Sequence, residues 1–255
     1  MGSSKIQTAL LIPDVHIDSE DERALKLLIK IAKQIKTLKE IIVMGDFGTL
    51  NSVSRWGQRP DKYTILSNEI KHINAWLDVF DKEFSSNKYK KKFIEGNHCY
   101  RAERYIISKA PELFGMIRIQ DLLRLKQRKW EFVPYGPNQR TFVLNSKCIA
   151  RHEPIGRSAS TTARSAGPNV RAVFYAHNHN LDQAVQGHLD GSVTESYCTG
   201  FLGDEKHLEF SYAKIKNWQK GFRLVHFNEK KEHFVETIKI SKNYEAIAQG
   251  RLFKG

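Results

Sequence analysis

Two short stretches decide the fold: Pro13-Asp14-Val15-His16, which ends the first apolar run, and Tyr175-Ala176-His177-Asn178-His179, far downstream. Each follows aliphatic and β-branched residues, at 9–12 and 170–174, and this pattern predicts a strand that ends in a turn. Carboxylate oxygen and imidazole nitrogen suit borderline divalent metals, and residues i and i+2 of a tight turn can converge on one or two ions. The two stretches therefore predict a metal site where two strand ends meet.

Three further apolar runs also end in polar side chains. Residues 40–44 lead into Gly45-Asp46, residues 91–94 into a Gly-Asn-His motif, and residues 147–151 into His152. Any one of these motifs alone is explained as well by an ordinary turn, because Gly, Asn and Asp are common in the turns at strand ends. Five such strand ends together favour a metal site. The polar side chains at these five strand ends are Asp14, His16, Asp46, Asn97, His98, His152, His177 and His179.

The segments between these motifs predict alternating helices and strands. Residues 21–39 carry apolar side chains at helical spacing, with Ser19 as the expected N-cap. A strand, helix, strand order of this length predicts a right-handed parallel crossover, so the strand ends share one edge of a sheet. Downstream, we expect antiparallel strands at 192–197, 221–227 and 233–240 to close a second sheet, and a helix or tail over 243–255.

The ordered motifs resemble those of the calcineurin-like metallophosphoesterase superfamily over residues 14–179, and the surroundings of 218–222 look most like phage and prophage members. The resemblance implies an α/β (α+β) fold, a four-layer αββα sandwich with two mixed β-sheets that carries two metals. It implies in-line attack on phosphorus by a hydroxide that bridges them. The implied ligand sets are Asp14, His16 and His179 for one metal, Asn97, His152 and His177 for the other, and Asp46 for both.

His98 is not needed as a ligand in this scheme and is predicted to be catalytic. It would protonate the leaving oxygen or stabilise charge on the phosphate. Three positions depart from the family pattern: Thr49 replaces the second acid of G-D-x-x-D, Cys99 the acid after Asn-His, and Ala176 the Gly before His-x-His. Without its partner acid, His98 is expected to be less basic. Cys99 is interpreted as a buried, chemically inert residue.

The composition indicates an anionic substrate. Lys and Arg number 41 against 28 Asp and Glu, a formal net charge of +13, and such a surface attracts polyanions. DNA or RNA is therefore a candidate partner. Arg101, at the start of a predicted helix, and Arg55, beside the Asp46 turn, are candidate phosphate-binding residues. For Arg55 the alternative is an exposed arginine that contacts only solvent.

Mixed Asp, Asn and His ligation fits Mn²⁺, Fe, Zn²⁺ or Ni²⁺, and Mn²⁺ is our choice for assays. We expect a single metallophosphoesterase domain over 1–255, with a cap or insert at 100–140 and a C-terminal tail at 241–255. The sequence has no apolar run long enough for a membrane span and no signal peptide, and its three cysteines suit a reducing cytoplasm. For a phage protein this would be the host cytoplasm.

The first functional hypothesis is therefore a dinuclear-metal phosphoesterase that hydrolyses a phosphodiester, with nucleic acid as a candidate substrate. A phosphomonoesterase or protein phosphatase is the alternative within the same chemistry. A non-catalytic module that binds nucleic acid or protein on the same fold is the alternative from another class, and the replacements at Thr49 and Cys99 motivate it.

Overall fold

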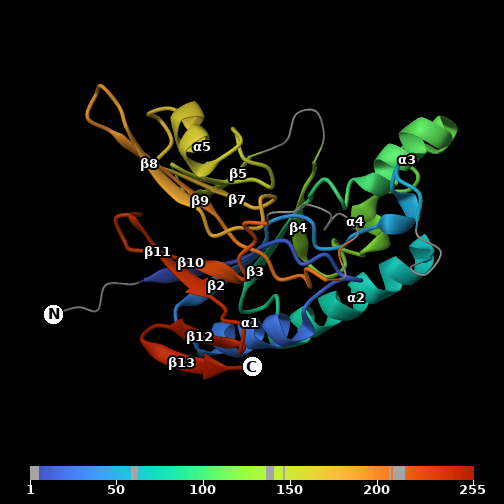
Figure 1. The fold of residues 1–255 in the computed structure, drawn as a ribbon, viewed down its shortest axis with the longest axis horizontal. Helices are drawn as coiled ribbons and strands as arrows, with labels where there is room; N and C mark the ends of the chain where they lie inside the picture. The colour runs from blue at the N-terminus through green and yellow to red at the C-terminus, as the bar shows by residue number, and fades with distance from the viewer. Residues whose placement is uncertain (1–5, 59–62, 136–140, 146, 207, 209–215) are drawn as a thin grey trace.

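The computed structural model describes residues 6–58, 63–135, 141–145, 147–206, 208 and 216–255. In this part of the chain five α-helices accompany two large β-sheets and a C-terminal hairpin, so the fold is mixed α/β (Figure 1). None of the helices described there has the length and apolar character that a bilayer span requires.

The larger sheet has six strands in the order β11-β10-β1-β2-β3-β4. Strands β1 to β4 run parallel to one another, and β10 and β11 are antiparallel to their neighbours. The carboxyl ends of β1, β2 and β3 therefore lie at one edge. The strands are β1 (Gln7–Ile12), β2 (Leu38–Val43), β3 (Lys90–Ile94), β4 (Trp130–Val133), β10 (Gly221–Phe227) and β11 (His233–Lys239).

The second sheet has five strands in the order β5-β6-β7-β9-β8. Its three central strands are parallel, and β5 and β8 pair antiparallel at the edges, so both sheets are mixed. The strands are β5 (Phe142–Asn145), β6 (Cys148–Ala150), β7 (Ala172–Tyr175), β8 (Gln183–Gly187) and β9 (Val193–Cys198).

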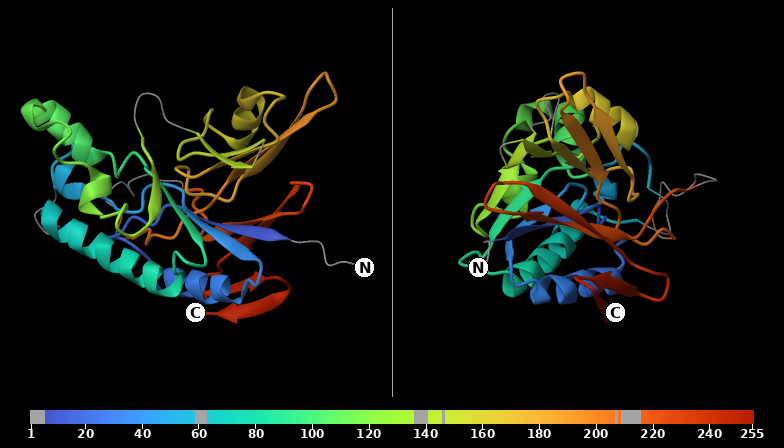
Figure 2. Two further views of the ribbon diagram at one scale, coloured as in Figure 1. Left: turned by 180° about the vertical axis from the view of Figure 1, so that it is seen from behind. Right: turned by 90° about the vertical axis from the view of Figure 1, so that its left-hand side faces the viewer.

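The two sheets pack face to face, and helices cover their outer faces (Figure 2). Leu11 and Ile42 of the first sheet share one buried cluster with Ala150 and Phe174 of the second. On the outer face of the first sheet, helices α1 (Glu22–Gln34) and α2 (Leu66–Glu83) form a separate core. Helix α5 (Ala159–Ala166) covers the other sheet. The layers are thus helix, sheet, sheet, helix.

The prediction that 221–227 and 233–240 close the second sheet is wrong. Strand β10 pairs with β1, and β11 pairs with β10, so both extend the first sheet. Leu224 of β10 faces the helix-side core and Val225 faces the core between the sheets. A strand buried on both faces lacks the polar alternation that would indicate which sheet it joins.

The expected tail at 241–255 is instead a hairpin of β12 (Glu245–Ala248) and β13 (Arg251–Lys254). Its two-residue turn has left-handed φ angles of 49° at Gln249 and 70° at Gly250, the backbone that a tight hairpin requires. Ala246 and Ala248 are buried in the helix-side core while Ile247 is exposed. The short alternation and the Gln-Gly pair were the signals of this hairpin.

The predicted N-cap of the first helix also changes. Asp21, not Ser19, caps α1, since its carboxylate accepts from the N–H of Ala24 at 3.0 Å. Within 100–140, α3 (Arg101–Lys109) projects outward, whereas α4 (Ile119–Leu122) packs into the helix-side core and β4 is an edge strand of the first sheet. Residues 136–140 lie outside the described residues.

Candidate metal centre

Five strands of the two sheets deliver polar side chains to one place. Three of these strands, β1, β2 and β3, belong to the first sheet, and β6 and β7 belong to the second. In both sheets the strands concerned are parallel, so their carboxyl ends meet where the sheets face each other. The side chains brought together are Asp14, His16, Asp46, Asn97, His98, His152, His177 and His179.

The first group of converging side chains consists of Asp14, His16 and His179. The Nε2 atoms of the two histidines lie 3.1 Å apart, and His179 Nε2 lies 3.1 Å from Asp14 Oδ2. All three residues are buried, and one ligand atom from each lies within 4.8 Å of the others. The ring of His179 also stacks on Phe201, with ring centroids 4.5 Å apart.

The second group consists of Asp46, His152 and His177, with Asn97 beside it. The Oδ1 atom of Asn97 lies 2.8 Å from His152 Nε2 and 3.0 Å from His177 Nδ1. His152 Nε2 is 3.3 Å from Asp46 Oδ2. A third overlapping group joins Asp46 to His16 and His98, so Asp46 and His16 connect the two clusters.

Backbone N–H groups hold the two carboxylates in position. The N–H of His177 donates to Asp14 Oδ2 at 2.8 Å, and the N–H of His98 donates to Asp46 Oδ1 at 2.7 Å. The first bond ties a turn of the second sheet to a turn of the first. The other carboxylate oxygens are thus oriented before any ligand binds.

The turns that carry these side chains have unusual backbone angles. Asp46 has a φ of 36°, and His16, His177 and His179 have φ angles of 53°, 69° and 58°. Residues other than glycine seldom adopt the left-handed region, and each such position costs about 1–3 kcal/mol. Four of them in one centre mark a site that the surrounding structure maintains at the expense of stability.

Two glycines allow the close approach of these turns. A Cβ at Gly96 would lie 2.2 Å from both the backbone nitrogen and Oδ1 of Asp46. A Cβ at Gly45 would lie 2.1 Å from Nδ1 of His152, and Gly45 has a φ of 116°. Both glycines are therefore needed for space, and Gly45 is also needed for its positive φ angle.

The carboxylates and imidazoles of the centre shift one another's pKa values. Burial alone would raise the pKa of Asp46, but the charge of His152 and its hydrogen bond to Asp46 outweigh burial and hold this pKa well below its usual range. Burial likewise opposes protonation of His152, yet Asp46 and Asp14 raise the pKa of His152 to about 9. Protonated His152 supplies the carboxylates with positive charge that a bound cation would otherwise supply.

The residues fit a divalent metal. They offer carboxylate and amide oxygens and imidazole nitrogens, the donor set of Mn²⁺, Fe, Zn²⁺ or Ni²⁺. Oδ1 of Asp14 is fully buried and has no hydrogen-bond partner among the described residues. Nδ1 of His152 lies 3.6 Å from this oxygen, beyond hydrogen-bond distance, and a coordinated cation would give the buried oxygen a direct partner.

His98 is held as a neutral ring. Its Nδ1 donates to the carbonyl oxygen of Thr49 at 3.2 Å, and its Nε2 accepts from Nη2 of Arg101 at 3.3 Å. Burial, with a contribution from Arg101, lowers the pKa of His98 to about 3. The carbonyl of Thr49 thus contacts His98 where the sequence lacks the second acid. Because this contact comes from a backbone carbonyl, the residue type at position 49 does not predict it.

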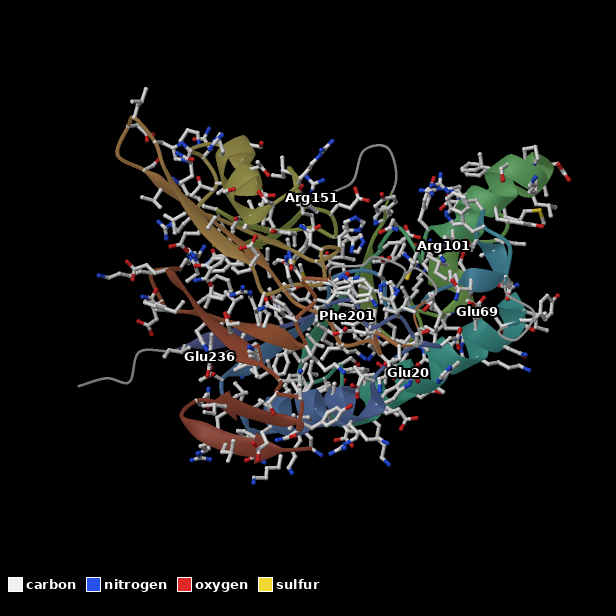
Figure 3. The ribbon with its side chains drawn as sticks, in the orientation of Figure 1. Glu20, Glu69, Arg101, Arg151, Phe201 and Glu236 are labelled. Atoms are coloured by element: carbon white, nitrogen blue, oxygen red, sulfur yellow. The ribbon has the colours of Figure 1, made fainter. Side chains whose placement is uncertain are left out.

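The two candidate phosphate-binding arginines lie on one side of the centre. Nη1 of Arg101 donates to the carbonyl of Thr49 and to Asn51 Oδ1, both at 3.0 Å. Arg55 is exposed, with its guanidinium carbon 4.9 Å from the centroid of the Trp56 ring. Figure 3 shows Phe201 near the middle of the molecule and Arg101 towards α3. Cys99 is fully buried and burial raises its thiol pKa, which agrees with its interpretation as a buried residue without a chemical role.

A comparison with protein-family models found no match for this sequence, and a search of curated proteins found no relative. The functional conclusions therefore depend on the residues and their geometry.

Proposed function

We propose that this chain is a dinuclear-metal phosphoesterase of the calcineurin-like type, related to phage members, that hydrolyses a phosphodiester. One observation carries the proposal: three overlapping groups of buried carboxylate and imidazole side chains share Asp46 and His16. Two cations close together repel each other, and a shared carboxylate offsets that repulsion. The layer order and the parallel strand ends support the same fold type.

In this proposal Asp14, His16 and His179 would hold one cation, Asn97, His152 and His177 would hold the other, and Asp46 would contribute its carboxylate to both sets. Such a pair of cations supplies Lewis acidity to phosphoryl oxygens and makes water more acidic. The side chains need only hold the cations and orient the phosphate, and no nucleophilic side chain is required.

The contact between His98 and Arg101 refines the catalytic role proposed for His98. A guanidinium always donates, so His98 Nε2 accepts and carries no proton in this arrangement. Proton donation to a leaving group would first require Arg101 to move. The geometry therefore favours a role in which His98 orients Arg101 and the guanidinium stabilises charge on the phosphate.

We expect hydrolysis of bis-p-nitrophenyl phosphate by the full chain in the presence of Mn²⁺, and loss of that hydrolysis after chelation with restoration on adding Mn²⁺. Turnover on monoesters but on no diester would favour the phosphatase alternative. Absence of metal-dependent hydrolysis with any of these substrates, in protein that binds nucleic acid, would favour the non-catalytic module.

A further inference from the structure

A cavity of about 490 Å³ opens beside the candidate metal centre. Asn97 lines this cavity, and the same Asn97 contacts His152 and His177 of the centre. One wall comes from residues 53–56, which begin at the last residue of the short 3₁₀-helix η1 (Asn51–Val53), and another comes from α3. A ligand in the cavity would thus lie directly against the predicted metal ligands.

The cavity is positively charged. Four of its lining side chains are cationic, and none of the described residues that line it is acidic. Two other cavities on the described surface, one beside Asp21 and Asp204 and one beside Glu40 and Glu229, contain both signs of charge. The uniform charge favours an anionic ligand, and arginine matches phosphate oxygens in particular. The cationic residues are Arg55, Arg101, Arg104 and Lys109.

Two aromatic side chains of the same cavity are exposed. Trp56 is 68% exposed and Tyr105 is 42% exposed, although both are large enough to favour burial. Exposed aromatic rings among arginines are the combination on which unpaired nucleobases stack. Bases of a duplex already stack on one another, so their faces are not available to such rings.

The cavity wall that carries Trp56 is held by hydrogen bonds to helix α2. Glu69 of α2 is fully buried, and its carboxylate accepts from the N–H of Asn51 at 2.6 Å and from the N–H of Ser52 at 3.1 Å. The Ser52 hydroxyl also donates to Glu69. The turn before Trp56 is therefore fixed to a helix of the core, which reduces the ordering cost of binding.

We propose that this cavity binds a single strand of nucleic acid, with phosphates on its arginines and an unpaired base on Trp56 and Tyr105. The proposal deepens the proposed function, and it relies on that function for the assignment of the strand as substrate. The strand would pass Asn97 and present a phosphodiester to the metal centre.

The test measures binding by the full-length protein in the presence of chelator, so that no hydrolysis contributes. The probes are a short labelled oligothymidylate and an abasic oligonucleotide of the same length and charge. We expect Trp56→Ala to raise the Kd for oligothymidylate about tenfold to a hundredfold, and to change the Kd for the abasic strand by less than about twofold. Trp56→Phe should restore most of the affinity.

Phe234 of β11 provides a matched control, because it is an aromatic residue with 58% exposure on a strand remote from α3 (Figure 1). Phe234→Ala should leave both Kd values unchanged. Arg104→Gln should weaken both probes and reduce the slope of log K against log salt by about 0.7.

Equal affinity for the two probes, or an oligothymidylate Kd unchanged by Trp56→Ala, would overturn the proposal. Displacement of oligothymidylate by polyglutamate at equal charge concentration would also overturn it and indicate an acidic protein partner. Hydrolysis of bis-p-nitrophenyl phosphate by the wild-type chain is measured in a separate assay. A chain that binds the strand through Trp56 but hydrolyses nothing would refute the proposed function and retain the binding site.

Discussion

Replacing Asp46 with asparagine is expected to lower kcat for bis-p-nitrophenyl phosphate by about 10³-fold or more. The metal pair contributes several kcal/mol to such a reaction, and Asp46 is the carboxylate that connects both clusters. Asparagine keeps the shape and can still accept from the N–H of His98, which Asp46 Oδ1 does at 2.7 Å. The loss of kcat would therefore result from the lost charge and weaker metal binding, because the turn is preserved.

The matched control for this substitution is Asp190→Asn. Asp190 is an exposed acid in the β8–β9 hairpin, where it accepts from Ser192. The Asp190→Asn substitution should leave kcat unchanged, and both variants should retain the circular dichroism spectrum of the wild type. An Asp46→Asn enzyme with more than about a tenth of wild-type kcat would refute the role given to this carboxylate.

Gly96→Ala is expected to reduce activity by about 10²-fold and to destabilise the protein by about 1–3 kcal/mol. The added Cβ would lie 2.2 Å from Asp46 N and Oδ1, so the turn with Asn97 and His98 or the turn with Asp46 must shift. A shift of about 1 Å in a catalytic group is enough for such a loss. Urea denaturation and kcat measurements test the two effects separately.

Gly187→Ala is the control for this second substitution. Gly187 lies in β8, and a Cβ there would meet no atom within 4 Å. We expect wild-type activity and a free energy of unfolding equal to that of the wild type or slightly higher. If Gly96→Ala behaved like Gly187→Ala, the close packing of the two turns would have no functional importance.

The sequence predicted which side chains converge because its signals are local. Asp14 and His16, like His177 and His179, directly follow short apolar strands, and parallel strands bring their carboxyl ends to one edge. The positions of such residues follow from topology and need no knowledge of side-chain packing. The fold class was implied by the resemblance of the motifs, and the described helices and sheets agree with a mixed α/β fold.

The features that sequence reasoning missed depend on packing between distant segments. The cavity combines Trp56 with Tyr105, which come from different elements and show no shared motif. Thr49 acts through its carbonyl, which every residue possesses. Strand β10 is buried on both faces, so its pattern was consistent with either sheet. Each of these became evident only from the three-dimensional arrangement.

The most direct test of the central claim is the number of metal ions that the full-length protein binds. The chain is stripped with chelator, dialysed against Mn²⁺ near neutral pH and analysed for manganese per polypeptide. We expect two ions for the wild type and fewer for Asp46→Asn, because Asp46 connects both clusters. Wild-type protein that is folded but retains no manganese, zinc, iron or nickel under these conditions would contradict it.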